Sequence, residues 1–476
     1  MPDAHRSRDK GRITRRDVLK RAAAGGGLLG VGAWARRCCG AEAAPQIEAG
    51  MGVVDTSPPL GIELAGFHRA PGNERRVTGV RHATVARALV LRHGEVAAAI
   101  VSLDVCAVSR QYAQETARRV ARQVGIPAEH VRLCATHTHS MPSFRYLRQW
   151  GAMPAEYMAD VQEKIVRAVA AARDDLAPAE VLLGRHRVVD GNFNRTTSKW
   201  KTDAEFGPDS TDEERWLDTM LSALLFRRPG GKGDFVWYHF SAHPVCYTDG
   251  NAGPDWPALV DEKVRNDHKL TPSFLQGHCG DVNPGGGKPW LGEPDQVAGA
   301  VCAGIDAALD AARPLEPGGL WSETAEVELP LDIPLFRQRL EAYRADPPKC
   351  NRGSYVDARF AADWAESAAR WDPGRTTLAA PISALRLGRL GLLFHPAELY
   401  SFYGLAIGRD SALDPTLAVG YTDAMVGYLP DPTAYERGEY AALTVPGILD
   451  LPPFTPVAAR HFTAEALGLL KRIAKK

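Results

Sequence analysis

The sequence has no excess of charge of either sign. Lys plus Arg and Asp plus Glu each total 57 in a chain of 476 residues, which makes the formal net charge at pH 7 zero. Beyond the first forty residues no basic block stands out. Proteins that bind nucleic acid usually carry such a block or a basic stripe, so we expect no nucleic-acid partner.

Long apolar runs are also missing. The stretch at 22–35 is apolar, but it is too short and too rich in glycine to be a stable membrane span. It follows Arg15-Arg16 and precedes Ala41-Glu42-Ala43, which has the form of a signal-peptidase site. This order resembles a twin-arginine export signal. We therefore expect 1–44 to be an export signal and the mature chain to be periplasmic or secreted by a bacterium, without a transmembrane segment. The alternative is a disordered basic tail.

Closely spaced cysteine pairs are absent after the signal. Six cysteines lie beyond residue 44 and are widely scattered: Cys106, Cys134, Cys246, Cys279, Cys302 and Cys350. This spacing fits neither a disulfide framework nor a Cys-x-x-Cys zinc site. We expect most of them to be small buried hydrophobic residues.

Apolar runs alternate with helical patterns along the rest of the chain, which indicates an α/β fold. Strands are predicted at 131–134, 181–189, 235–240, 273–276 and 392–394, and helices at 110–124, 155–171, 295–312, 399–409 and 463–474. The sequence contains no internal repeat.

The clearest chemical signal is Thr136-His137-Thr138-His139-Ser140, which follows the apolar run 131–134. Residues i and i+2 of an extended chain point to the same side, so His137 and His139 are expected to face one pocket. Neutral imidazole is the commonest metal ligand in proteins. The pair alone is also compatible with two histidines in a polar turn.

Three further ligand-type residues follow apolar runs downstream, namely His243, Asp281 and Glu398. A catalytic zinc ion typically takes three nitrogen or oxygen ligands and keeps one position open. Two histidines and a carboxylate suit that pattern. Each residue also has a structural alternative, because a His before Pro or a Glu that opens a helix can simply bind backbone groups.

Four motifs follow one another along the chain: Thr136-His137-Thr138-His139-Ser140, Ala242-His243-Pro244, Gly280-Asp281-Val282-Asn283-Pro284 and Pro396-Ala397-Glu398. In this order they resemble the neutral/alkaline non-lysosomal ceramidase family. The opening segment Gly50–Pro59, Asn194-Arg195, Gly427-Tyr428 and Thr433-Ala434-Tyr435 are similar to the family as well. The resemblance extends from about Gly50 to Tyr440.

The resemblance implies a zinc ion and a set of roles. The zinc ligands would be His137, His243, Glu398 and Tyr435, with His139 against the substrate carbonyl or the attacking water, and Arg195 in contact with substrate. The implied fold is an α/β catalytic domain of mixed sheets flanked by helices. The family's C-terminal immunoglobulin-like domain is expected to be absent, because few residues follow Tyr440, so 45–476 would be a single catalytic domain.

One family position differs in this chain. Asn283 stands where the family has a serine implicated in catalysis, and an asparagine cannot act as a nucleophile. It can still orient substrate or water by hydrogen bonding. Asp281 is expected to orient a metal-binding histidine.

The sequence thus predicts an exported zinc-dependent hydrolase that cleaves an amide or ester bond with a metal-activated water. Its substrate would be a ceramide-like lipid or another small molecule. The alternative is a metal-binding homologue that binds a ligand without turnover. An amidohydrolase-type barrel is disfavoured, since several predicted strands precede His137.

Overall fold

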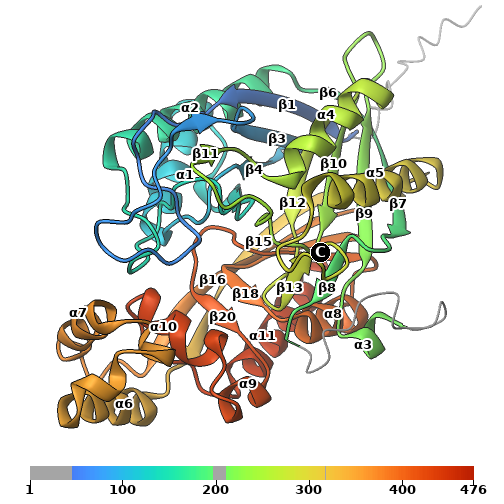
Figure 1. The fold of residues 1–476 in the computed structure, drawn as a ribbon. Coiled ribbons are helices and arrows are strands. Elements are labelled where there is room, and N and C mark those ends of the chain that lie inside the picture. Colours follow the sequence, from blue (N-terminus) through green and yellow to red (C-terminus); the bar gives the residue numbers. More distant parts are fainter. Residues whose placement is uncertain (1–45, 197–210, 317) are drawn as a thin grey trace, which may run out of the picture. The chain divides into compact units, whose positions relative to one another are not determined.

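Three large β-sheets, each with parallel and antiparallel neighbours, form the frame of the protein (Figure 1). The structure is a computed structural model that describes residues 46–196, 211–316 and 318–476. The predicted export signal lies outside the described residues. Helices cover the sheets, which confirms the predicted α/β fold with mixed sheets flanked by helices. The absence of an immunoglobulin-like domain stays a prediction.

The first sheet has the order β5-β4-β3-β1-β6, with β4 and β5 parallel and the other neighbours antiparallel. Its strands are β1 (Glu48–Asp55), β3 (Val85–His93), β4 (Val96–Leu103), β5 (Val131–Ala135) and β6 (Ala177–Pro178). The second sheet has the order β12-β10-β9-β7-β14, with β10 and β12 parallel. Its strands are β7 (Glu180–Arg187), β9 (Met220–Arg227), β10 (Phe235–Phe240), β12 (Thr271–Gln276) and β14 (Arg313–Pro314).

The third sheet has the order β15-β16-β17-β19, with β17 and β19 parallel. Its strands are β15 (Leu320–Pro330), β16 (Thr377–Leu387), β17 (Leu390–Phe394) and β19 (Thr416–Val419). Side chains from all three sheets meet in one apolar cluster that includes Leu89, Ile100, Phe226, Trp237, Leu385 and Phe394. One face of each sheet is therefore buried against the other sheets, which leaves the other face for helices.

Each sheet packs helices against its second face. The longer helices are α1 (Arg110–Val124), α2 (Ala155–Asp174), α4 (Trp256–His268), α5 (Pro294–Asp310), α6 (Ile333–Ala345), α7 (Ala358–Ala368), α8 (Ser401–Asp410) and α11 (Ala458–Ile473). Figure 1 shows α2 over β1 and β3, and α4 and α5 over the second sheet. Helix α11 packs on β15 and β16. The remaining helices and turns are short: α3 (Asp212–Arg215), α9 (Pro432–Glu436), α10 (Val445–Ile448), 3-10 turns at Ala128–His130, Pro347–Cys350 and Gly353–Tyr355, and a π-helical turn at Tyr440–Thr444.

Local sequence explains where several of these elements begin and how closely they pack. Ser109 caps α1 by accepting a hydrogen bond from the Tyr112 N–H, and Gly125 ends the helix in the left-handed conformation. At Gly52 a Cβ atom would come within 2.1 Å of the Ala168 carbonyl oxygen, so the close approach of α2 to β1 requires glycine. No helix within the described ranges combines the length and apolarity needed to cross a bilayer.

Three two-stranded ribbons complete the strands of the described residues. They pair β2 (Gly79–Val80) with β11 (Asn251–Ala252), β8 (Asn192–Asn194) with β13 (Val282–Pro284), and β18 (Ala397–Leu399) with β20 (Gly427–Leu429). The helix predicted at 399–409 therefore begins two residues later, at Ser401, because Leu399 pairs with Leu429 in a strand. That pairing partner lies far along the chain, where a local pattern does not reveal it.

Candidate metal centre and substrate pocket

His137 lies just beyond β5 and is buried, with 2% of its surface exposed. Its Nδ1 lies 2.7 Å from the carbonyl oxygen of Cys106, and its Nε2 faces Glu398. The backbone of His137 has a φ of 64°, in the left-handed region. His137 is therefore not in an extended strand, and the prediction that strand alternation aligns it with His139 is wrong. A left-handed turn brings the two rings together instead, with their centroids 4.9 Å apart.

His243 follows β10 and is fully buried. Its Nδ1 lies 2.7 Å from the carbonyl oxygen of Val282, in the loop that β13 begins. The Nε2 of His243 lies 3.6 Å from Oε2 of Glu398 on β18, and the Nε2 of His137 lies 3.5 Å from the same oxygen. The structure thus brings His137, His243 and Glu398 together from three separate segments.

Hydrogen bonds and burial fix the charges of this cluster. Burial would raise the pKa of Glu398, but the interactions with the neighbouring His137 and His243 outweigh it and hold that pKa far below its usual value. Burial likewise opposes a proton on His137, but the side chains of Cys106 and Glu398 raise its pKa to about 10. Burial, with Arg195 nearby, lowers the pKa of His243 to about 4. Without a metal ion, the cluster therefore holds an ionised carboxylate and one protonated histidine.

The His137–His243–Glu398 cluster fits a divalent metal ion. One ligand atom from each residue lies within 4.8 Å of the others. Two ligands about 2.0–2.1 Å from a tetrahedral ion are roughly 3.3–3.4 Å apart, close to the observed separations. The Nε2 of His243 has no hydrogen-bond partner among the described residues, as expected of an atom aimed at an ion. Backbone carbonyls orient both imidazoles from behind, an arrangement typical of metal-binding histidines.

Tyr421 contacts two residues of the His137–His243–Glu398 cluster, and sequence reasoning did not identify it. Its ring stacks on His137 with centroids 4.1 Å apart, and its hydroxyl lies 3.5 Å from Oε2 of Glu398 and 3.1 Å from Sγ of Cys279. Tyr421 is buried and has a φ of 53°. A bulky residue in the left-handed region costs free energy that the surrounding contacts must offset. The sequence shows several tyrosines after Glu398, but it does not show which of them makes these contacts.

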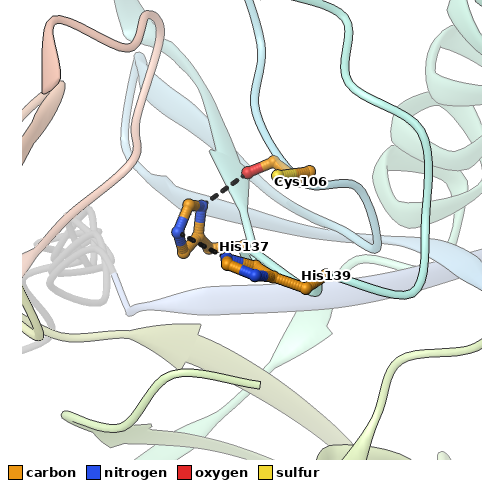
Figure 2. A group of neighbouring side chains, drawn as sticks. All are labelled: Cys106, His137 and His139. Carbon is orange, nitrogen blue, oxygen red and sulfur yellow. Dashed lines mark hydrogen bonds between the residues drawn. The ribbon is translucent and has the colours of Figure 1, made fainter. Parts of the chain in front are cut away.

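His139 lies beside the cluster, with its Nε2 3.3 Å from Nε2 of His137 (Figure 2). Burial and the neighbouring His137, His243 and arginines hold the pKa of His139 well below its ordinary value. Its Nδ1 is buried and has no hydrogen-bond partner within the described part of the chain. His139 is therefore a neutral imidazole at physiological pH and can accept a proton.

Asp281 has a different role from the one predicted. Its Oδ1 accepts hydrogen bonds from the backbone N–H and the hydroxyl of Ser401, and its Oδ2 accepts one from Asn194. The histidine nitrogens that Asp281 was expected to orient are bound to the carbonyls of Cys106 and Val282 instead. Buried with several donors around it, Asp281 holds together the start of α8 and the loop after β8.

Arg195 is held in place by hydrogen bonds to three residues. Its guanidinium donates to Oδ1 of Asn283 at 3.0 Å, to the carbonyl of Gly280 at 2.8 Å and to the hydroxyl of Tyr428 at 2.6 Å. The amide nitrogen of Asn283 donates to the carbonyl of Trp290 at 2.8 Å. Asn283 thus bridges Arg195 and the Trp290 loop, which gives it a positioning role in this structure.

Tyr428 lies beside the metal cluster in place of the expected Tyr435. The β18–β20 ribbon pairs Tyr428 directly with Glu398. Tyr435 lies on α9, where burial raises its pKa and the acting neighbours are Tyr403, Asp332 and Asp431, none of which belongs to the cluster. The assignment of Tyr435 as a metal ligand therefore stays a prediction, and Tyr428 is the tyrosine that the ribbon places next to Glu398. Several tyrosines follow Glu398 in the sequence, and only the long-range strand pairing distinguishes them.

A cavity of about 520 Å³ opens beside Tyr428. Its lining is mainly aromatic and basic: Arg195, Thr196, Gly280, Trp290, Tyr400, Tyr428, Arg437, Glu439, Tyr440 and Ala441. Such a volume is in the range of small-molecule sites, which usually combine apolar walls with a few polar groups. The cavity therefore provides space for a substrate next to the His137–His243–Glu398 cluster.

Comparison with known proteins gives a consistent result. The family described as neutral/alkaline non-lysosomal ceramidase, N-terminal, matches residues 47–315, which confirms the resemblance found in the sequence. A neutral ceramidase of Mycobacterium tuberculosis (strain ATCC 25618 / H37Rv) is 24% identical, and the match covers 83% of this chain and 73% of that protein.

Two solved structures share the fold. The neutral ceramidase of Pseudomonas aeruginosa superposes with a TM-score of 0.71 at 18% identity, over 91% of this chain and 75% of that one. A ceramidase complexed with C2 superposes with a TM-score of 0.69 at 17% identity, over 91% of this chain and 76% of that one. At these identities the structural likeness concerns the fold alone.

Proposed function

The chain belongs to the neutral/alkaline non-lysosomal ceramidase family, and we propose that it is a zinc-dependent hydrolase of the amide bond of an N-acyl lipid such as ceramide. The observation that carries this proposal is the buried His137–His243–Glu398 cluster, whose Glu398 pairs in the β18–β20 ribbon with Tyr428, a residue that lines the cavity. Family membership supports amide hydrolysis of a lipid. The zinc ion and the exact substrate are the finer parts of the proposal.

His137, His243 and Glu398 would hold the ion, because all three are buried and correctly spaced, and backbone carbonyls already orient the two histidines. Two nitrogen donors and one carboxylate suit zinc, which often leaves a further coordination position open in catalytic sites. When bound, zinc lowers the pKa of a water molecule and polarises a carbonyl. The identity of the metal is supported by this donor chemistry alone.

The chain's own residues supply the remaining chemistry. His139 is neutral and its Nε2 faces the cluster, 3.3 Å from Nε2 of His137, so it accepts the proton that the attacking water loses. Arg195 and the hydroxyl of Tyr428 are two hydrogen-bond donors in the lining of the cavity. There they stabilise negative charge that develops on the substrate oxygen. Burial holds the pKa of Tyr428 well above its ordinary value, so its hydroxyl keeps its proton.

The cavity walls favour an acyl amide with an apolar portion. Tyr400, Tyr428, Tyr440 and Trp290 present aromatic surface, while Arg195 provides a charged group beside the Tyr428 hydroxyl. Apolar walls stabilise a hydrocarbon chain in proportion to the buried area, at about 25 cal/mol per Å². An ester with the same acyl chain would fit the same site, so both bond types belong in the test.

Metal content and turnover should be measured together on the purified protein. We expect zinc near one per chain, release of fatty acid from ceramide or a related N-acyl amide, loss of release with a chelator, and recovery with zinc. Glu398→Gln should lose both zinc and turnover, whereas Glu436→Gln, an exposed carboxylate on α9, should keep both. Wild-type turnover that persists without any metal would refute the proposal.

One observation favours a second candidate, a ligand-binding protein without turnover. Asn283 cannot act as a nucleophile, and both ends of its amide are engaged by Arg195 and Trp290. If the protein binds zinc in a full amount but releases no product from a panel of N-acyl amides and esters, this second candidate replaces the hydrolase.

We also propose that the protein is exported, on the evidence of Arg15-Arg16 and the apolar stretch that follows. Cell fractionation of a bacterium that expresses the full chain should find it in the periplasm. Replacement of both arginines by lysine should retain it in the cytoplasm. Equal export of the two forms would contradict a twin-arginine route.

A further inference from the structure

Cys106, His137 and His139 form a second group of metal-binding donors next to the first (Figure 2). One ligand atom from each lies within 4.8 Å of the others. The group adds two donors that the first cluster does not use, the thiol of Cys106 and the imidazole of His139. It shares His137 with the His137–His243–Glu398 cluster, so the two groups are not independent.

The two imidazoles of this group are already spaced as ligands. The Nε2 atoms of His137 and His139 lie 3.3 Å apart, which is close to the roughly 3.3–3.4 Å expected for two nitrogens about 2.0–2.1 Å from one tetrahedral ion. Gly66 holds His139 closely in this place, since a Cβ atom at Gly66 would come within 2.3 Å of its Cγ. The carbonyl of Cys106 occupies Nδ1 of His137, which leaves Nε2 as the donor.

Cys106 supplies the third donor. Its thiol is free, and only 1% of the residue's surface is exposed. A buried cysteine is often only a small hydrophobic residue. This one differs because a ring nitrogen of each of two imidazoles lies within 4.8 Å of its sulfur. Sulfur and nitrogen donors together select soft ions, whereas the first cluster contains a carboxylate and no thiol.

We propose that Cys106, His137 and His139 form a second metal position that takes soft, thiophilic ions such as Cd²⁺ through the Cys106 thiolate. An ion bound there replaces the thiol proton, which passes to solvent. Because both positions need Nε2 of His137, they cannot be filled at the same time. A soft ion therefore draws His137 away from Glu398 and His243 and displaces the ion of the first cluster.

Cadmium and cobalt titrations of the metal-free full chain test this proposal without any hydrolysis assay. Thiolate coordination produces an ultraviolet sulfur-to-metal charge-transfer band that nitrogen and oxygen ligands do not produce. We expect this band with Cd²⁺ in the wild type, and with Co²⁺ in Glu398→Gln, where the first cluster has lost its carboxylate. Cys106→Ser should abolish the band, and Cys302→Ser, which removes another buried thiol in α5, should keep it.

Several results would overturn the proposal. They are a band that survives in Cys106→Ser, the absence of a band with saturating Cd²⁺, or two Cd²⁺ ions bound at once in the wild type. Should Cys106→Ser fail to fold, His139→Gln provides the second variant and must also lose the band. Cadmium NMR of the unmodified protein gives an independent readout, because a thiolate ligand moves the resonance strongly downfield. These outcomes are the same whether or not the protein hydrolyses an amide.

Discussion

Replacing Tyr428 by phenylalanine tests the assignment of the substrate wall most directly. The change removes one oxygen atom and leaves the buried ring in place. The lost oxygen is the one to which Arg195 donates at 2.6 Å, next to Glu398 in the β18–β20 ribbon. Arg195 keeps its hydrogen bonds to Asn283 and Gly280, so the guanidinium should remain in position.

We expect Tyr428→Phe to lower turnover strongly and substrate affinity only slightly. Removing one preorganised donor from the site where negative charge develops typically lowers kcat about 10²–10³-fold, or about 2.7–4 kcal/mol. A hydrogen bond to a charged group contributes about 1.5–3 kcal/mol to stability, so a modest fall in melting temperature is also expected. KM should change little, because the donor acts mainly in the transition state.

The matched control is Tyr435→Phe, which removes the same atom from a tyrosine on α9 away from the cluster. Steady-state kinetics on the substrate identified by the panel, together with calorimetric melting, should be recorded for both variants. We expect Tyr435→Phe to stay within about threefold of the wild type, in line with a change outside the site. If Tyr435→Phe loses zinc or turnover while Tyr428→Phe keeps both, the structural assignment is wrong.

Three further predictions concern the metal cluster and its surroundings. Tyr421→Phe should weaken zinc binding about 10-fold or more, because it removes the hydroxyl that faces the carboxylate of Glu398. Competition with a chelator measures the zinc affinity, and an unchanged affinity would contradict this prediction. Gly66→Ala should lower turnover by pushing His139 aside, whereas Gly61→Ala, with a similar positive φ but open space, should not; equal kinetics would refute the contact. The raised pKa of His137, about 10 against an ordinary 6.5, stabilises the metal-free protein fully below pH 6.5, and this contribution is lost as pH rises through 10. The melting temperature of the metal-free form should therefore fall over that range, and a flat profile would count against the ion pair.

The sequence alone indicated the fold class and the family, because both depend on local patterns and on the order of short motifs. Apolar runs with period-two and helical spacing predicted an α/β protein, and polar residues after those runs marked His137, His139, His243, Asp281 and Glu398 as ligand-type residues. The resemblance to the family, and not residue type or position alone, then selected His137, His243 and Glu398 from this set. The metal-binding role of these three residues stays a prediction that metal analysis must test.

The tertiary structure decided which partners each of these residues meets. The pairing of β18 with β20 brings Tyr428 to Glu398 and leaves Tyr435 on α9. The carbonyls of Cys106 and Val282, instead of Asp281, orient the two histidines. Such contacts join segments that are distant in the chain, and they depend on packing and hydrogen-bond satisfaction over the whole core. Residue types therefore indicated the chemistry of the site, whereas the long-range contacts determined its geometry.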